Sequence, residues 1–246
     1  MGENVSTAAV HKAKTGFLTA LGDRLGPSGI ELIHEQDRQI PAADELDAAG
    51  MRALKNAVFA PLLAAKIEGA EELIANQYRS ADTMTDRLAA FSSLRVWSDN
   101  AALVDDVTDD FYRSYKDIPL VINTWFQVQA QVPGEAGLEL FTRLLNHPDF
   151  TLNNPNRARS LLGPFVANNL SALHHPSGKG VELFADQIVA FDDINPQVAA
   201  RLLTMIGDWK ILELNAQDNC KAALNRIAAK ENISRDLEEI VSRTLA

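Results

Sequence analysis

The chain has 246 residues, 46% of them hydrophobic, so it is long enough to bury a substantial core. Its 33 acidic residues outnumber its 23 basic ones, for a net charge of −10, and no basic stripe is present that could neutralise phosphates, which argues against nucleic acid as a partner. No apolar run approaches the roughly 20 residues that span a bilayer, and no signal peptide is visible, so we expect a cytoplasmic protein without a membrane partner.

Amphipathic segments follow one another with short polar joints, and the alternating pattern of β-branched strands is missing, which indicates an all-α protein. Helices are expected at 5–24, 27–36, 42–66, 68–79, 84–96, 99–115, 118–131, 134–146, 155–167, 180–192, 196–210, 215–230 and 234–244. No break in composition marks a second domain, so we expect a single all-α domain over 1–246, with 1–40 as lead-in helices. Successive helix pairs without a strict sequence period favour a superhelical solenoid of paired antiparallel helices, of the HEAT/armadillo kind, and a compact helical bundle is the alternative.

Two phrases in the second half share one pattern, in which Asn-Pro opens an amphipathic run with arginine near its start. The first reads Asn-Pro-Asn-Arg-Ala-Arg from Asn154, and the second reads Asn-Pro-Gln-Val-Ala-Ala-Arg from Asn195. Asparagine is a good N-cap because its side-chain oxygen accepts from an unpaired helix N–H, and proline suits the next position, where its missing N–H is no loss. We therefore predict that helices begin at Asn154/Pro155 and Asn195/Pro196.

The arginines of these helices are candidates for binding. Arg157 and Arg159 flank the apolar stripe of the first helix, and Gln197 and Arg201 share one face of the second because they are four residues apart. An arginine beside a helix N-terminus adds a planar donor fork to free N–H groups, an arrangement that suits the acidic end or the backbone carbonyls of a peptide. The alternative is that each arginine pairs with a nearby acid or extends over the surface. The stripe of the second helix is expected to be Val198, Leu202, Met205, Ile206 and Trp209.

Four further sequence phrases, spread over most of the chain, add to these two. They are the Met51–Asn56 helix start, the Asp-Thr-Met-Thr-Asp segment within 77–91, the Leu-Val-Ile-Asn-Thr-Trp-Phe segment within 119–130, and the terminus 230–246. With the two Asn-Pro phrases, and in this order, they resemble the C-terminal helical domain of the aminopeptidase N (alanyl aminopeptidase) family of zinc metallopeptidases. The resemblance covers 49–246. It implies the curved HEAT/armadillo-like solenoid rather than the compact bundle.

The resemblance also implies a function. In that family this domain caps the catalytic domain of the same polypeptide and walls off a chamber, so that only small peptides and unfolded N-termini reach the zinc. The matching chamber-facing positions here are Arg159, Gln197 and Arg201, whose implied role is contact with peptide substrates, not catalysis. The zinc belongs to the catalytic domain of the parent enzyme.

The motifs that carry the family's chemistry are missing from this sequence. Zinc binding needs H-E-x-x-H on a helix, and the closest text is His34-Glu35-Gln36-Asp37-Arg38, in which arginine cannot be a ligand. We therefore expect no catalytic residue, no metal site and no cofactor in this chain, and no activity from it alone.

The remaining reactive or aromatic side chains are expected to be structural. His174 and His175 are predicted to lie in a loop, exposed or capping, and the single cysteine, Cys220, is predicted to be a buried apolar thiol. Trp97, Trp125 and Trp209 lie on apolar stripes, so core packing is the expectation for each.

A second hypothesis is a free-standing helical-repeat adaptor, whose groove binds a peptide or protein through arginines that grip acidic side chains. The surface discriminates between the two. A domain that belongs against a catalytic partner exposes apolar residues where that partner docks, whereas an adaptor presents a polar groove.

Overall fold

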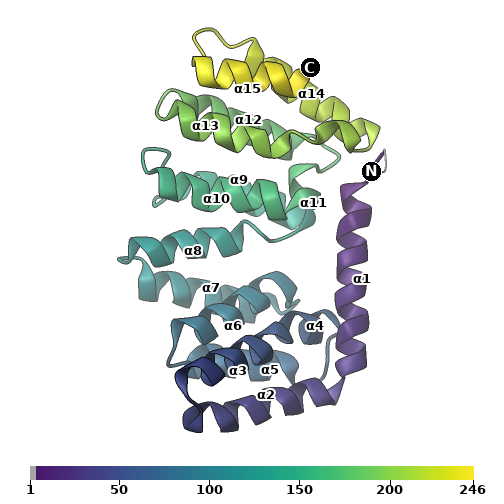
Figure 1. The fold of residues 1–246 in the computed structure, drawn as a ribbon, viewed down its shortest axis with the longest axis vertical. Helices are drawn as coiled ribbons and strands as arrows, with labels where there is room; N and C mark the ends of the chain where they lie inside the picture. The colour runs from purple at the N-terminus through teal and green to yellow at the C-terminus, as the bar shows by residue number, and fades with distance from the viewer. Residues whose placement is uncertain (1–3) are drawn as a thin grey trace. The chain divides into compact units, whose positions relative to one another are not determined.

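The computed structural model describes residues 4–246, which are helical almost throughout (Figure 1). Their α-helices are α1 (Thr7–Leu25), α2 (Pro27–Gln39), α3 (Glu45–Ala57), α4 (Phe59–Ala64), α5 (Ala70–Ser80), α6 (Met84–Trp97), α7 (Ala101–Tyr115), α8 (Pro119–Gln129), α9 (Gly134–Leu145), α10 (Pro155–Asn168), α11 (Leu170–Leu173), α12 (Lys179–Asp192), α13 (Pro196–Leu203), α14 (Leu214–Ala228) and α15 (Arg235–Leu245). Short 3₁₀ turns are η1 (Ile40–Ala42), η2 (Thr204–Ile206) and η3 (Trp209–Ile211). Within this part of the chain the only extended pairing is an isolated bridge between Val5 and Leu212, so the all-α prediction is confirmed.

The chain divides into two compact units. The N-terminal unit is Lys12–Lys116, and the C-terminal unit is Asp117–Ala246 together with the chain up to His11. The boundary between the two units falls within α1. The expectation of one domain over 1–246 stays a prediction.

The C-terminal unit consists of two layers of helices (Figure 1). One layer holds α8, α10, α13 and α15 in that order, and the other holds α9, α12 and α14. Across the layers, α8 packs on α9, α12 on α13 and α14 on α15, the paired arrangement expected of a solenoid. Buried aromatic rings join neighbouring helices, since Phe141 of α9 and Phe165 of α10 stack with their centroids 3.6 Å apart. This order places α10 next to α13, so the two Asn-Pro helices are neighbours.

The N-terminal unit packs α5 against α6, α6 against α7 and α2 against α3. Its core includes the stacked rings of Phe91 and Phe111, with centroids 4.6 Å apart and both side chains fully buried. The aromatic stack fixes α6 against α7, which positions the turn that joins them.

A buried polar cluster, the Asp86 junction, ties α3 to α5 and α6. It consists of Asp86 with Lys55, Asn56, Arg52 and Gln77. Lys55 is only 4% exposed, and its Nζ lies 3.3 Å from Asp86 Oδ2 and 2.6 Å from Asp37 Oδ1. Asn56 Nδ2 donates to Asp86 Oδ1 at 3.0 Å, and Gln77 Nε2 donates to the Asp86 carbonyl at 3.0 Å. The two buried charges, Lys55 and Asp86, are therefore each paired, as desolvation requires.

The predicted helix starts are confirmed where the prediction rested on a capping residue. Asn154, Asn195 and Ser234 each accept a backbone N–H from the first turn of α10, α13 and α15. Pro164, which has no N–H to donate to the Ser160 carbonyl, lies inside α10, and the helix continues past it to Asn168.

The structure corrects two helix predictions. The single helix expected at 42–66 is divided into α3 and α4, because Pro61 lacks the N–H that would bond Ala57 and its ring crowds that carbonyl. The helix expected at 196–210 ends at Leu203 and tightens into 3₁₀ turns. As a consequence Met205, predicted to lie in the apolar stripe, is 42% exposed.

Candidate functional site

The first turn of α10 is fixed by its cap. Asn154 Oδ1 accepts the backbone N–H of Asn156 at 3.0 Å and of Arg157 at 3.2 Å, and Pro155 occupies the first helical position. Because the cap sets where the helix begins, it also sets which arginine of the phrase points inward and which points to solvent.

Arg157 points inward and is 8% exposed. Its Nε donates to Asn123 Oδ1 of α8 at 2.7 Å, and its Nη1 donates to the Asp149 carbonyl at 3.0 Å. The guanidinium lies over the Phe126 ring, 5.1 Å from the centroid. Arg157 therefore joins α10 to α8 and to the segment before α10, and its role is structural.

Arg159 is exposed and folds back on its own helix. Its Nε donates to the Pro155 carbonyl at 3.2 Å, and its Nη2 donates to Asn156 Oδ1 at 2.9 Å. The guanidinium thus lies beside the first turn of α10, held only by exposed hydrogen bonds that cost little to exchange.

Gln197 and Arg201 lie one turn apart on α13, whose start is capped by Asn195 Oδ1 accepting the Val198 N–H at 3.2 Å. Both side chains are exposed. Within residues 4–246 neither side chain makes a hydrogen bond or ion pair, and the Thr204 hydroxyl donates to the backbone carbonyl of Arg201 at 2.7 Å. An exposed guanidinium without a partner is available to a ligand carboxylate or carbonyl.

The structure brings the three predicted residues onto neighbouring helices. Arg159 is on α10 and Gln197 and Arg201 are on α13, two helices that contact one another in the same layer (Figure 1). Met205, one turn beyond Arg201 and exposed, adds an apolar group that sequence reasoning placed in the core. The Gly207 that follows is the signal that could have ended the predicted helix earlier.

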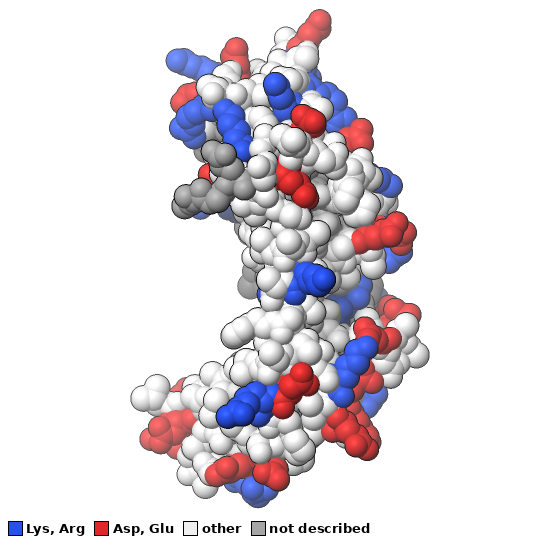
Figure 2. Space-filling model, turned by 90° about the vertical axis from the view of Figure 1, so that its right-hand side faces the viewer, with Lys and Arg blue, Asp and Glu red and all other residues white. Residues whose placement is uncertain are grey.

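Acidic and basic side chains alternate on the face shown in Figure 2, and no continuous basic stripe is visible there. The expectation that nucleic acid is not a partner stays a prediction. No helix in the described part of the chain is long and apolar enough to cross a membrane.

One histidine prediction was wrong. His174, expected to be exposed or capping, is 8% exposed and contacts Cys220, with Nδ1 and Sγ 3.6 Å apart. Burial lowers the pKa of His174 to about 4 and raises the pKa of Cys220 to about 12, so the pair is a neutral imidazole and a thiol. This pair lacks the thiolate that nucleophilic chemistry needs, and the prediction of a buried Cys220 is confirmed. His175 does cap its loop, since its Nδ1 accepts the Ser177 N–H at 3.3 Å.

The described residues also contain a cavity that sequence reasoning missed. It is bounded by the end of α4 and the turn between α6 and α7, and Trp97, predicted to be a core residue, is only half-buried on its wall. The position of Trp97 at the last residue of α6, directly before the polar run Ser98-Asp99-Asn100, is the signal that could have identified it.

These features define an all-α protein of paired helices with one exposed arginine on α10 and another on α13. The chain belongs to the family described as "Domain of unknown function (DUF3458_C) ARM repeats", whose model matches residues 1–246. This membership confirms the armadillo-type solenoid fold, and the relatives that follow confirm the resemblance to the C-terminal helical domain of the aminopeptidase N family.

Three named relatives of this chain are all aminopeptidase N. The chain is 31% identical over 245 residues to aminopeptidase N of Caulobacter vibrioides, covering 100% of this chain and 28% of that protein. It is 32% identical to aminopeptidase N of Escherichia coli K12, covering 98% of this chain and 27% of the relative. With aminopeptidase N of Haemophilus influenzae the identity is 39% over 174 residues, covering 70% of this chain and 20% of the relative.

A solved structure shows the same fold. The chain matches Legionella pneumophila aminopeptidase A, crystallised in complex with aspartic acid, with a TM-score of 0.86 and 27% identity, over 99% of this chain and 29% of that one. The chain thus spans less than a third of the proteins it matches and is homologous to their C-terminal region.

Proposed function

We propose that this chain is the C-terminal domain of a zinc-dependent aminopeptidase N that removes N-terminal residues from peptides in the cytoplasm. In that enzyme the domain caps the catalytic site, limits access to it and lines the substrate chamber, and it performs no catalysis alone. Its partners are the catalytic domain of the same polypeptide and the peptide substrates. The names of the three curated relatives, all aminopeptidase N, support this proposal.

The observation that carries the proposal is the state of Arg201. Its exposed side chain has no hydrogen-bond or ion-pair partner within residues 4–246, and it lies one turn from the equally exposed Gln197. Arg159, on the adjacent helix, is also exposed. Guanidinium forks bind carboxylates and carbonyl oxygens, which every peptide carries, so this surface suits the part of a peptide beyond the scissile bond.

Exposed apolar residues in the N-terminal unit favour the hypothesis of a domain that docks on a catalytic partner, rather than the hypothesis of a free-standing adaptor. Phe17 is 68% exposed and Leu21 is 39% exposed, and the two lie one turn apart on α1. Leu46 of α3 is 83% exposed. Large apolar groups that share a face mark a surface that another protein segment covers, and we assign that segment to the catalytic domain of the same polypeptide.

We place the zinc of the proposed enzyme outside residues 4–246. Across residues 4–246 no three His, Cys, Asp or Glu side chains are grouped so that they could hold a metal ion. The His34–Arg38 run lies on α2 with arginine at the position that a second histidine would need. The donor set here does not fit zinc, so no step of the reaction is assigned to residues of this chain.

The proposal is tested by replacing Arg201 with alanine in the full-length enzyme. We expect kcat/KM to fall about tenfold on peptides of several residues, since one charge-assisted contact is lost, and to stay nearly constant on a minimal chromogenic amino-acid substrate. Arg143→Ala is the matched control, because Arg143 is an exposed arginine of the same unit on α9, in the other layer.

Equal losses on the minimal substrate and on long peptides would argue against a peptide contact at Arg201. An intact native protein of about the size of this chain, found by immunoblot, would favour the adaptor hypothesis instead.

A further inference from the structure

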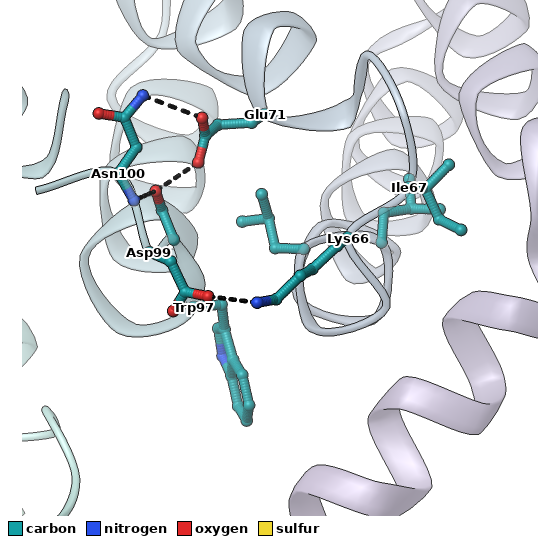
Figure 3. A pocket seen from close by; sticks show the side chains of 9 residues that line it. Lys66, Ile67, Glu71, Trp97, Asp99 and Asn100 are labelled. Carbon is teal, nitrogen blue, oxygen red and sulfur yellow. Dashed lines mark hydrogen bonds and ion pairs between the residues drawn. The ribbon is translucent and has the colours of Figure 1, made fainter.

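A cavity of about 320 Å³ opens on the N-terminal unit between the end of α4 and the turn from α6 to α7 (Figure 3). Its accessible apolar wall is formed by Ile67 and the half-buried indole of Trp97, and the fully buried Leu62 lies behind it. Three charged side chains complete it: Lys66, Glu71 and Asp99. This volume lies at the small end of the range for ligand pockets and suits a single side chain rather than a long peptide.

Lys66 occupies a backbone position that normally favours glycine. Its φ is 54°, and the Lys66 N–H donates to the Leu63 carbonyl while the Ile67 N–H donates to the Leu62 carbonyl, both at 3.0 Å. This is the Schellman ending of a helix, in which the left-handed residue is most often glycine. A side chain kept at a strained position points to a use for that side chain.

The strained backbone sends the Lys66 ammonium across the cavity mouth. Its Nζ lies 2.5 Å from Asp99 Oδ2, and Figure 3 shows this ion pair spanning the space beside Trp97. Both side chains are highly exposed, so water and salt screen the pair and it opens at little cost.

Glu71 is oriented by neutral donors alone. Its Oε1 accepts from Ser98 Oγ at 2.5 Å, and its Oε2 accepts from Asn100 Nδ2 at 3.1 Å (Figure 3). Within residues 4–246 no lysine or arginine forms an ion pair with Glu71. The carboxylate is therefore held in one geometry and lacks a counter-cation.

The lining has a definite charge character. Two carboxylates, Glu71 and Asp99, and one ammonium line the cavity, and the partly exposed indole of Trp97 lies below the Lys66–Asp99 pair in Figure 3. A cation gains from a carboxylate and from the face of a tryptophan ring at the same time. An anion would meet two carboxylates, and a neutral apolar molecule would cover Glu71 without compensating its charge.

We propose that this cavity binds the side chain of a basic amino acid, with its alkyl stem against Trp97 and its ammonium or guanidinium group at Glu71. Lys66 is the internal competitor, which closes the mouth on Asp99 when the cavity is empty and moves aside when it is filled. The proposal stands apart from the peptide contacts at Arg201 and does not depend on them. The basic side chain comes either from a free amino acid or from a residue of a peptide.

The first experiment titrates this chain by calorimetry with n-butylammonium and, for comparison, with the neutral 1-butanol. We expect the cation to bind with a millimolar dissociation constant and the alcohol to bind at least about tenfold more weakly. Comparable binding of the two would overturn the proposal, since the carboxylates would then contribute nothing. Absence of binding by the cation would overturn it as well.

Variants locate the site. Glu71→Gln keeps an acceptor for Ser98 and removes the charge, and we expect it to weaken binding about tenfold. The matched control is Asp106→Asn, which removes one negative charge from an exposed position on α7 outside the cavity and should change binding less than about twofold. Equal weakening by the two variants would mean general charge attraction and would contradict the assignment.

Lys66→Gly is expected to change the affinity for the cation in the opposite direction to Glu71→Gln. It removes the competing ammonium and places glycine at the left-handed position, so it should tighten binding several-fold while the chain stays folded. Weaker binding in this variant would contradict the role of Lys66 as competitor. Parallel titrations with L-arginine and with the peptide Ala-Arg-Ala then distinguish the two sources of the basic side chain. Tighter binding of L-arginine would identify a free amino acid, and tighter binding of the peptide would identify a peptide residue.

Discussion

Charged residues have opposite environments in two regions of the molecule. At the Asp86 junction of the N-terminal unit, Asp86 and Lys55 are buried and paired with each other. On α13 of the C-terminal unit, Arg201 is exposed and unpaired within residues 4–246. Burial of a charge is tolerated only with partners. The charges of the first region therefore act in stabilising the fold, whereas the exposed arginine of the second region can bind a ligand.

The largest effect is expected from Asp86→Ala. The substitution leaves Lys55 buried with only Asp37 as counter-charge and removes the acceptor of Asn56, so the free energy of unfolding should fall by about 3–5 kcal/mol. Urea unfolding followed by circular dichroism measures it. Asp106→Ala, which breaks an exposed pair with Arg79 on the same unit, should cost less than about 1 kcal/mol. Similar losses in the two variants would abolish the distinction between buried and exposed charge.

The second prediction separates two arginines of one phrase. Arg157→Ala strands Asn123 Oδ1 and the Asp149 carbonyl, and we expect a loss of about 2–3 kcal/mol in unfolding free energy. Arg159→Ala, two residues away and exposed, should stay within about 0.5 kcal/mol. The same urea titration measures both, and a reversal of the order would mean that the capped first turn does not fix which arginine points inward.

A buried group without an opposite charge should stay neutral, and His174 tests this. Its folded pKa of about 4 lies below the usual 6.5, so between these values the unfolded chain binds a proton that the folded chain does not. Stability should therefore fall as the pH drops through this window, by about 3 kcal/mol in total. His174→Leu should flatten that part of the pH profile, whereas His175→Gln, in the same loop, should leave it unchanged. A profile that His174→Leu does not alter would assign the acid sensitivity to other groups.

Sequence reasoning succeeded where one residue decides a local structure. Asn154 and Asn195 allowed the helix starts to be predicted, because a cap and a following proline act within a single turn. It also proposed Arg159 and Arg201 by resemblance, and both are exposed on neighbouring helices.

It failed where tertiary contacts decide. Met205 fits the apolar period, but the helix ends before it and leaves it exposed, while the Trp209 indole anchors the following turn by donating to the Thr244 carbonyl at 3.0 Å. His174 looked exposed because its burial against Cys220, 46 residues later in the chain, is invisible in local sequence. The cavity beside Trp97 is likewise assembled from α4, α5 and the α6–α7 turn, which no local pattern joins.

The smallest effect is expected from Arg201→Ala in this chain. Because its exposed side chain has no partner within residues 4–246, its removal should change the unfolding free energy by less than about 0.5 kcal/mol. Thermal and urea unfolding of the variant beside Arg157→Ala measure the contrast under identical conditions. A loss above about 1 kcal/mol would show that the guanidinium stabilises the fold. The loss of peptide turnover in the full-length variant would then reflect damage to the domain, and the unpaired arginine would no longer support a contact with substrate.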